Sequence, residues 1–173
     1  MSASGPINER LLTFEVDQGL YALPIRGVLE VAESALVTSV PMLSRDRCGV
    51  MNWHGDALPV ISPEILLQGA TSVSDEDAAE AELRTPESID DDTPGEAEPG
   101  AKPHVLVVSD RGELPKLGLP IDSVQGLVDG VIGRTRGLDL VLERRSIDGR
   151  VVCVLDPRGL VNRAEAVIEE MVL

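Results

Sequence analysis

The stretch LLTFEVDQGLYALPI, residues 11–25, decides the fold class, because it has the pattern of two short strands joined by a tight turn. Residues 11–16 are apolar with partial alternation, and residues 20–25 have the same character. Between them, Asp17-Gln18-Gly19 is typical of a turn, with Gly19 able to adopt a positive φ. The stretch therefore predicts a β-hairpin.

Short apolar segments separated by turn residues continue along most of the chain. Residues 27–31 are expected to be a strand or a bent turn of helix. Further strands are expected at residues 37–40, 49–53, 57–61, 105–108, 117–121, 123–128, 138–142 and 151–155. A short helix is expected over Pro63–Gln68, where proline opens the first turn. The tail, Asn162–Leu173, predicts an amphipathic helix capped by Asn162, with its apolar stripe packed on its own domain. This stripe contains Ala164, Val167, Ile168 and Met171.

The two halves of the chain repeat the same order of features. Leu23-Pro24-Ile25 is echoed by Leu119-Pro120-Ile121, and each half ends with a Gly-turned hairpin whose last strand runs into a proline. The pattern predicts an all-β fold of two tandem, small, SH3-like, five-stranded β-barrels within a single domain, 1–173. The first barrel is expected over 9–69, and the second, together with the C-terminal helix, over 103–173.

The segment between the two halves, residues 70–102, differs in composition from both. Residues 70–101 contain eleven acidic residues and one basic residue, with several prolines and no apolar periodicity. Such a segment buries too little apolar surface to offset the entropy of ordering it. It is expected to be a disordered acidic insertion, either a passive solubilising loop or one that steers basic partners.

Composition excludes several classes of function. The net charge is −15 and aromatic residues are 2% of the 173 residues, which weighs against nucleic-acid binders and proteins of anionic membrane surfaces. No apolar run is long enough to span a membrane and no secretory signal is visible, so a cytoplasmic protein without membrane insertion is expected. Cys48 and Cys153 lie in apolar surroundings and are expected to be buried, reduced thiols. No metal-ligand spacing or catalytic motif occurs, so no enzyme activity, metal or cofactor is expected.

The order of these segments resembles the CheW-like coupling proteins of bacterial chemotaxis arrays. The most specific match is residues 49–61, GVMNWHGDALPVI, which is similar to the family signature G-V-x-N-x-R-G-x-x-x-P-V-x-D. The opening hairpin and Val28-Leu29-Glu30-Val31 match in the first half, and residues 104–130 and 147–156 match in the second. The chain departs from the pattern at His54, where the family usually has Arg, and at Ser62, where it usually has Asp.

The resemblance implies a non-catalytic adaptor that couples a methyl-accepting chemoreceptor's cytoplasmic tip to a CheA-type histidine kinase, in association with receptor arrays. An alternative is a regulatory decoy or modulator that binds only one of these partners in another chemosensory pathway. The candidate partner-binding residues are Ile25, Val28, Glu30, Asn52, Trp53, His54 and Gly55. Ile25 and Val28 could equally be core residues, and Trp53 could be a core plug or an exposed anchor, whereas Glu30 is expected to face solvent.

Overall fold

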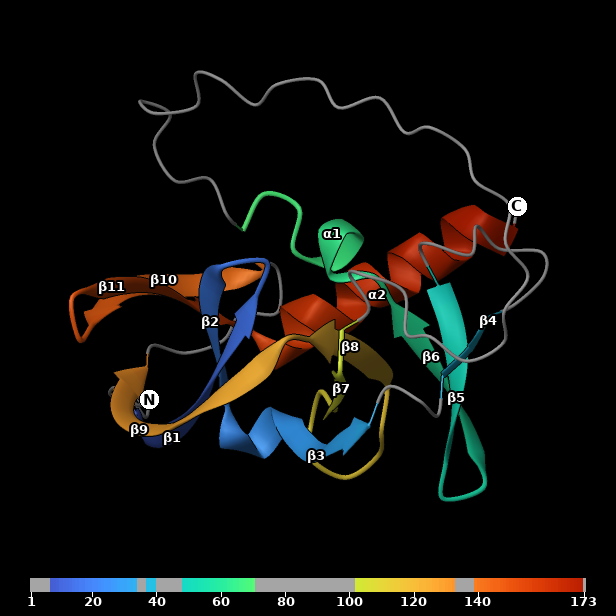
Figure 1. Cartoon of the computed structure of the whole chain (residues 1–173), viewed down its shortest axis with the longest axis horizontal. Helices are drawn as coiled ribbons and strands as arrows, with labels where there is room; N and C mark the ends of the chain where they lie inside the picture. The colour runs from blue at the N-terminus through green and yellow to red at the C-terminus, as the bar shows by residue number, and fades with distance from the viewer. Residues whose placement is uncertain (1–6, 34–36, 40–47, 71–101, 133–138, 173) are drawn as a thin grey trace, which may run out of the picture. The chain divides into compact units, whose positions relative to one another are not determined.

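The computed structural model describes residues 7–33, 37–39, 48–70, 102–132 and 139–172. These residues form eleven strands in two curled sheets, together with one 3₁₀ turn and two α-helices (Figure 1). The predicted all-β fold with a C-terminal helix is therefore confirmed. The acidic insertion lies outside the described residues, except for Ala70 and Lys102 at its two ends.

The first sheet contains five strands in the order β10-β11-β2-β1-β9. Their bounds are Ile7–Val16 (β1), Gly19–Pro24 (β2), Ser123–Ile132 (β9), Val141–Ile147 (β10) and Arg150–Leu155 (β11). β1 and β2 form the predicted hairpin, with Leu11 paired to Pro24 and Val16 to Gly19. The positive φ values in its turn belong to Asp17 (47°) and Gln18 (69°), so the turn does not use the positive φ that Gly19 could adopt. A turn whose two central residues both have positive φ has a backbone twist that matches the twist of the flanking strands.

The second sheet contains six strands in the order β3-β7-β8-β6-β5-β4. Their bounds are Val28–Glu33 (β3), Val37–Ser39 (β4), Cys48–Trp53 (β5), Asp56–Ile61 (β6), His104–Val108 (β7) and Leu117–Ile121 (β8). The 3₁₀ turn η1, Ile25–Gly27, leads from β2 of the first sheet into β3 of the second. The short helix α1, Pro63–Leu66, follows β6 and is two residues shorter than predicted.

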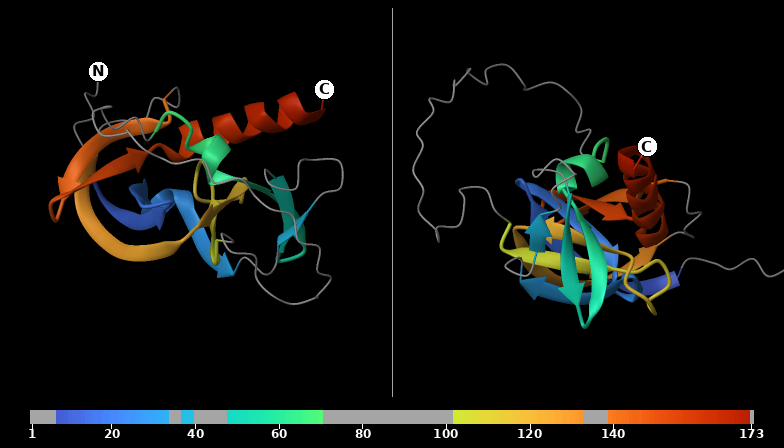
Figure 2. Two further views of the ribbon diagram at one scale, coloured as in Figure 1. Left: turned by 45° about the horizontal axis from the view of Figure 1, so that its top comes forward. Right: turned by 90° about the vertical axis from the view of Figure 1, so that its right-hand side faces the viewer.

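The predicted division into barrels at 9–69 and 103–173 is wrong, because each sheet takes strands from both halves of the chain (Figure 2). β1 pairs with β9 along nearly its full length, from Ile7 opposite Ile132 to Glu15 opposite Ser123. In the second sheet, β3 pairs with β7 and β6 runs parallel to β8. The second sheet also has six strands, not five. The repeated sequence pattern predicts strands, but their pairing depends on contacts between residues far apart in the chain.

Three clusters of buried apolar side chains stabilise this arrangement. One is built from first-sheet residues such as Leu11 and Val154, and another from second-sheet residues such as Met51 and Val107. The third and largest contains buried residues of both sheets and of the helices, and we call it the central cluster. Its buried members are Leu12, Phe14, Val16, Tyr21, Leu23, Ile61, Leu66, Leu67, Ala70, Leu106, Val108, Leu117, Leu119, Ile121, Cys153, Leu155, Leu160, Val161 and Ala164. The central cluster therefore joins the two sheets.

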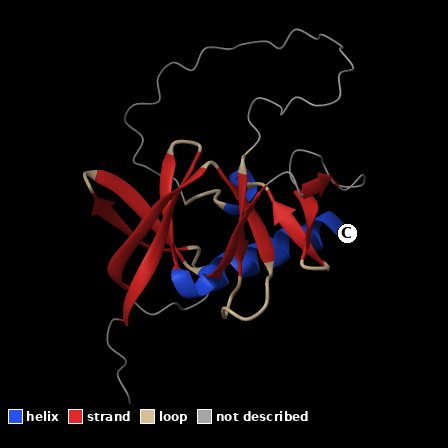
Figure 3. Ribbon diagram, turned by 60° about the horizontal axis from the view of Figure 1, so that its bottom comes forward, coloured by secondary structure: helices blue, strands red, loops and turns tan. Residues whose placement is uncertain are grey.

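The C-terminal helix α2, Pro157–Val172, begins five residues before the predicted start at Asn162 (Figure 3). Asp156 precedes it, and its Oδ1 accepts a hydrogen bond of 3.0 Å from the backbone N–H of Arg158. Asp156 is therefore the residue that caps the helix, and Asn162 lies within it. The predicted packing of the apolar stripe is confirmed, since Ala164 is buried in the central cluster and the rest of the stripe packs against it.

Both ends of the acidic insertion are part of the fold. The carbonyl of Ala70 accepts hydrogen bonds from Arg144 Nη2 (3.1 Å) and from Cys153 Sγ (3.3 Å). Cys153 is a buried free thiol, as predicted, whereas the side chain of Cys48 lies outside the described residues.

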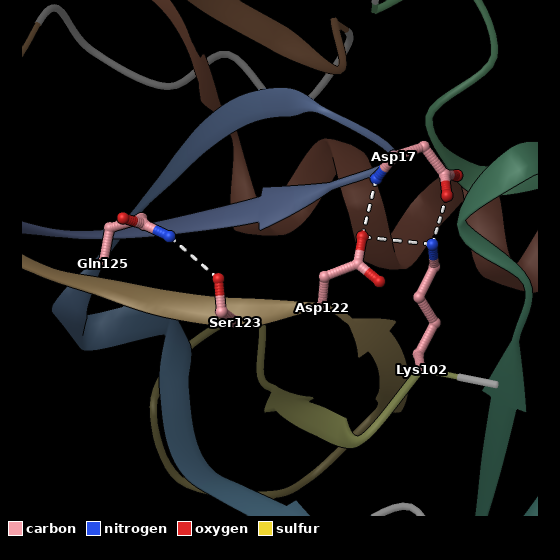
Figure 4. Close-up of polar contacts among 5 residues, drawn as sticks. All are labelled: Asp17, Lys102, Asp122, Ser123 and Gln125. Atoms are coloured by element: carbon pink, nitrogen blue, oxygen red, sulfur yellow. Dashed lines mark hydrogen bonds and ion pairs between the residues drawn. The ribbon is translucent and has the colours of Figure 1, made fainter. Parts of the chain in front are cut away.

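At the other end of the insertion, the ammonium group of Lys102 bridges Asp17 and Asp122 (Figure 4). Burial acts to lower the pKa of Lys102, but its hydrogen bonds to the two carboxylates outweigh burial and raise that pKa.

Candidate functional site

The turn between β5 and β6 has two consecutive residues with positive φ. His54 has φ +49° and Gly55 has φ +98°, so both lie in the left-handed region. Asn52 stabilises the turn, because its side-chain Oδ1 accepts a hydrogen bond of 2.9 Å from the backbone N–H of Gly55. A glycine is well suited to the second position, whereas a histidine at positive φ is uncommon. The turn presents the exposed His54 ring at the end of the hairpin.

The carboxylate of Glu30 joins this turn to β3. Glu30 Oε2 accepts a hydrogen bond of 2.8 Å from Trp53 Nε1 and lies 3.1 Å from His54 Nε2. β3 is one edge strand of the second sheet, and β5 lies near the opposite edge. The curl of the sheet thus brings together residues separated by 23 and 24 positions in the sequence. We call these three residues the Glu30–Trp53–His54 surface.

Trp53 combines the two roles that the sequence left open, a core plug and an exposed anchor. Its side chain is half-buried and packs against the apolar cluster of the second sheet. Its ring also meets the His54 ring edge to face, with centroids 4.5 Å apart and an angle of 80° between the planes. The indole N–H is directed to Glu30. Trp53 is therefore anchored in the core at one end and is part of a polar surface at the other.

The charge of this surface depends on Glu30. The hydrogen bond from Trp53, and secondly the one with His54, lower the pKa of Glu30 below its ordinary value. The side chains of Glu30 and His54 are 42% and 69% exposed, so the carboxylate is accessible to a partner. At neutral pH, Glu30 therefore presents a negative charge whose position is set by the indole N–H.

Ile25 and Val28 are placed differently from the other candidates. Ile25 opens η1 and is 40% exposed, whereas Val28 is half-buried and packs against the central cluster. In the described part of the chain, no hydrogen bond or ion pair joins either residue to Glu30, Trp53 or His54.

Sequence reasoning missed Val31 as a candidate residue. Simple alternation along β3 would turn Val31 inward, opposite to Glu30. The pairing with β7 is regular from Glu30 to Glu33, so Val31 lies on the opposite face of the strand from Glu30, yet it is 40% exposed. Because β3 is an edge strand of the second sheet, an apolar side chain on this face is open to solvent. No signal in the sequence marks this exposure, because it depends on the place of β3 in the sheet.

Two other classes of site find no support among the described residues. No group of three or more His, Cys, Asp or Glu side chains in this part of the chain is arranged to hold a metal ion. Within the same residues, no helix is both long enough and apolar enough to span a bilayer.

Comparison with known proteins supports the resemblance seen in the sequence. The family model of the CheW-like domain matches residues 10–165. Among solved structures, the chain is similar to the scaffolding protein TtCheW from Thermoanaerobacter tengcongensis, with a TM-score of 0.55 and 17% sequence identity. That match covers 86% of this chain and 89% of TtCheW. No curated protein matches the sequence. Since the family model spans most of the chain, the protein belongs to the CheW-like domain family.

Proposed function

We propose that this chain is a non-catalytic adaptor of a chemotaxis-type signalling pathway, which couples a chemoreceptor's cytoplasmic tip to a CheA-type histidine kinase. The observation that carries the proposal is the Glu30–Trp53–His54 surface, where residues from two separate strands of a CheW-like domain meet at an exposed carboxylate. The similar fold of TtCheW, a scaffolding protein, supports the same role.

The chemistry of this surface suits recognition of a protein partner. Trp53 supplies a large side chain that is already held in place, so little conformational entropy is lost when a partner covers it. Glu30 offers a fixed negative charge for a cationic or hydrogen-bond-donating side chain of the partner. Polar specificity next to an apolar anchor is typical of binding sites between proteins.

The proposal is tested by affinity capture of the tagged full chain from a lysate of its native organism, with the captured proteins quantified by mass spectrometry. The variants are Glu30→Lys and His54→Ala. Glu33→Lys is the matched control, because Glu33 is an exposed glutamate on the same strand and lies outside the Glu30–Trp53–His54 surface. Reversal of the Glu30 charge should weaken capture by about tenfold or more, which corresponds to about 1.4 kcal/mol.

The outcome depends on which partners are lost together. Capture of both a histidine kinase and a chemoreceptor by the wild type, reduced in Glu30→Lys but not in Glu33→Lys, supports the adaptor. Capture of one partner alone instead supports the decoy or modulator. Capture of neither, or an equal loss in Glu33→Lys, contradicts a coupling role for this surface.

A further inference from the structure

A second candidate site lies where η1, the β7–β8 loop and the start of α2 meet. An open pocket of about 320 Å³ is found there, lined by Arg26, Asp110, Arg111, Asp156, Pro157 and Arg158. The three arginines in its lining come from three separate segments of a chain whose net charge is −15. We propose that this pocket binds a phosphomonoester group. This goes beyond the adaptor function and involves none of the residues of the Glu30–Trp53–His54 surface.

The backbone around the pocket is held in place by close contacts. Gly27 packs so tightly against α2 that a Cβ atom there would lie 2.4 Å from Pro157 Cγ. Gly112 has φ +79°, and a Cβ atom there would lie 2.7 Å from the carbonyl oxygen of Arg26. Only glycine allows the β7–β8 loop to approach η1 in this way. The three arginines thus extend from segments whose spacing is set before any ligand arrives.

Two buried polar side chains stabilise the same region. Ser109 is fully buried, and its hydroxyl oxygen accepts hydrogen bonds from the backbone N–H groups of Gly112 (2.9 Å) and Arg111 (3.3 Å). Asp156 is also fully buried and accepts the backbone N–H of Arg158. These contacts order the loop that carries Arg111 and the turn that carries Arg158. A site that is ordered in advance binds with a smaller loss of entropy.

The three arginines that line the pocket retain N–H donors that are not used by other contacts. No hydrogen bond or ion pair joins the Arg158 guanidinium to another described residue. Arg26 reaches Glu9 through Nε at 3.3 Å, and Arg111 lies 3.8 Å from Asp110, which is beyond hydrogen-bond distance. Since each guanidinium has five N–H donors, these contacts leave donors for a ligand.

The three arginines outnumber the two carboxylates of the lining, Asp110 and Asp156, and their origin in three segments favours phosphate over carboxylate as the ligand. A carboxylate has two oxygens in one plane, and the fork of a single arginine satisfies them. A phosphomonoester has three terminal oxygens in a tetrahedral arrangement, which suits guanidinium groups that come from three segments. The pocket volume is at the lower end of the range for small-molecule sites, about 300–1,000 Å³, so the group that carries the phosphate also fits. That group can be a small metabolite or a phosphorylated side chain of another protein.

The test is a titration of the full chain with inorganic phosphate, free phosphoserine and a short neutral peptide containing phosphoserine, followed by NMR of arginine side-chain signals. Ionic strength is held constant with sodium chloride, because salt screens exposed charges. The variants are Arg158→Gln and Arg111→Gln. Arg10→Gln is the matched control, since Arg10 is an exposed arginine that does not line the pocket. Thermal unfolding of each variant checks that the fold is intact.

We expect saturable shifts of the Arg158 and Arg111 signals, with binding weakened about tenfold in either pocket variant and unchanged in Arg10→Gln. Tighter binding of the peptide than of free phosphoserine indicates a protein-borne phosphate, whereas equal binding indicates a small metabolite, and both support the site. The absence of saturable shifts with all three probes overturns the proposal. An equal loss in Arg10→Gln overturns it as well, because binding then reflects total charge alone.

Discussion

Replacement of Phe14 with alanine should destabilise both sheets together. Phe14 lies on β1 of the first sheet, is fully buried, and stacks on Tyr21 with ring centroids 5.9 Å apart. It belongs to the central cluster, which also contains second-sheet residues such as Leu106 and Leu117. If that cluster joins the sheets into one cooperative unit, a cavity at Phe14 should lower the stability of the whole fold.

The size of the effect follows from the burial of the ring. Truncation of a fully buried Phe to Ala costs about 3–5 kcal/mol, because apolar contacts are lost and a cavity is left. With a urea m-value of about 2 kcal/mol per molar, the unfolding midpoint should fall by about 2 M. Val151→Ala is the control, since Val151 lies on the same sheet with 62% of its surface exposed. Its unfolding free energy should change by less than about 0.5 kcal/mol.

The single tryptophan makes the assay informative. Trp53 lies on β5, so its fluorescence reports on the second sheet, whereas far-UV circular dichroism reports on all elements. In Phe14→Ala, the midpoints from both signals should fall by the same amount. A Trp53 midpoint that stays unchanged while the circular dichroism midpoint falls would show that the sheets unfold independently. A loss below about 1 kcal/mol would show that Phe14 does not fill the core as described.

Three further predictions concern polar contacts. The pKa of Glu30 is lowered, so the contribution of its contacts to stability should be complete above the ordinary pKa of 4.5 and lost as the pH falls through the lower pKa of the folded state. In the wild type, the fluorescence of Trp53 should change with pH below 4.5, whereas in Glu30→Gln it should not. The pKa of Lys102 is raised, so the contribution of its ion pairs to stability should be lost only as the pH rises above 10.5. Lys102→Met should lower the melting temperature more than Lys116→Met, in which an exposed lysine outside the bridge is replaced, and equal effects would refute the bridge. Asp156→Ala should cost about 0.5–2 kcal/mol in urea unfolding with loss of helical signal, and an unchanged midpoint would contradict its role as the helix cap.

Part of the candidate site is recognisable from local sequence patterns. The segment Gly49–Ile61 marks the turn that carries Asn52, Trp53 and His54, and the charge of Glu30 between two apolar neighbours indicates an exposed side chain. The contact between Glu30 and this turn could not be derived, since the two segments meet only when the second sheet curls. Val31 was missed because alternation from the exposed Glu30 predicts an inward side chain, whereas Val31 is 40% exposed on an edge strand.

Most of the strands and the all-β class could be predicted from the sequence, because apolar alternation and turn chemistry act over a few neighbouring residues. The family was indicated separately, by the resemblance of residues 49–61 to its signature. Which strands pair was settled only in three dimensions: β1 lies beside β9 and β3 beside β7, so the two halves of the chain interleave. The shared pocket of Arg26, Arg111 and Arg158 likewise exists only in the folded chain. These features depend on packing between distant segments, and local patterns in the sequence carry no information about such contacts.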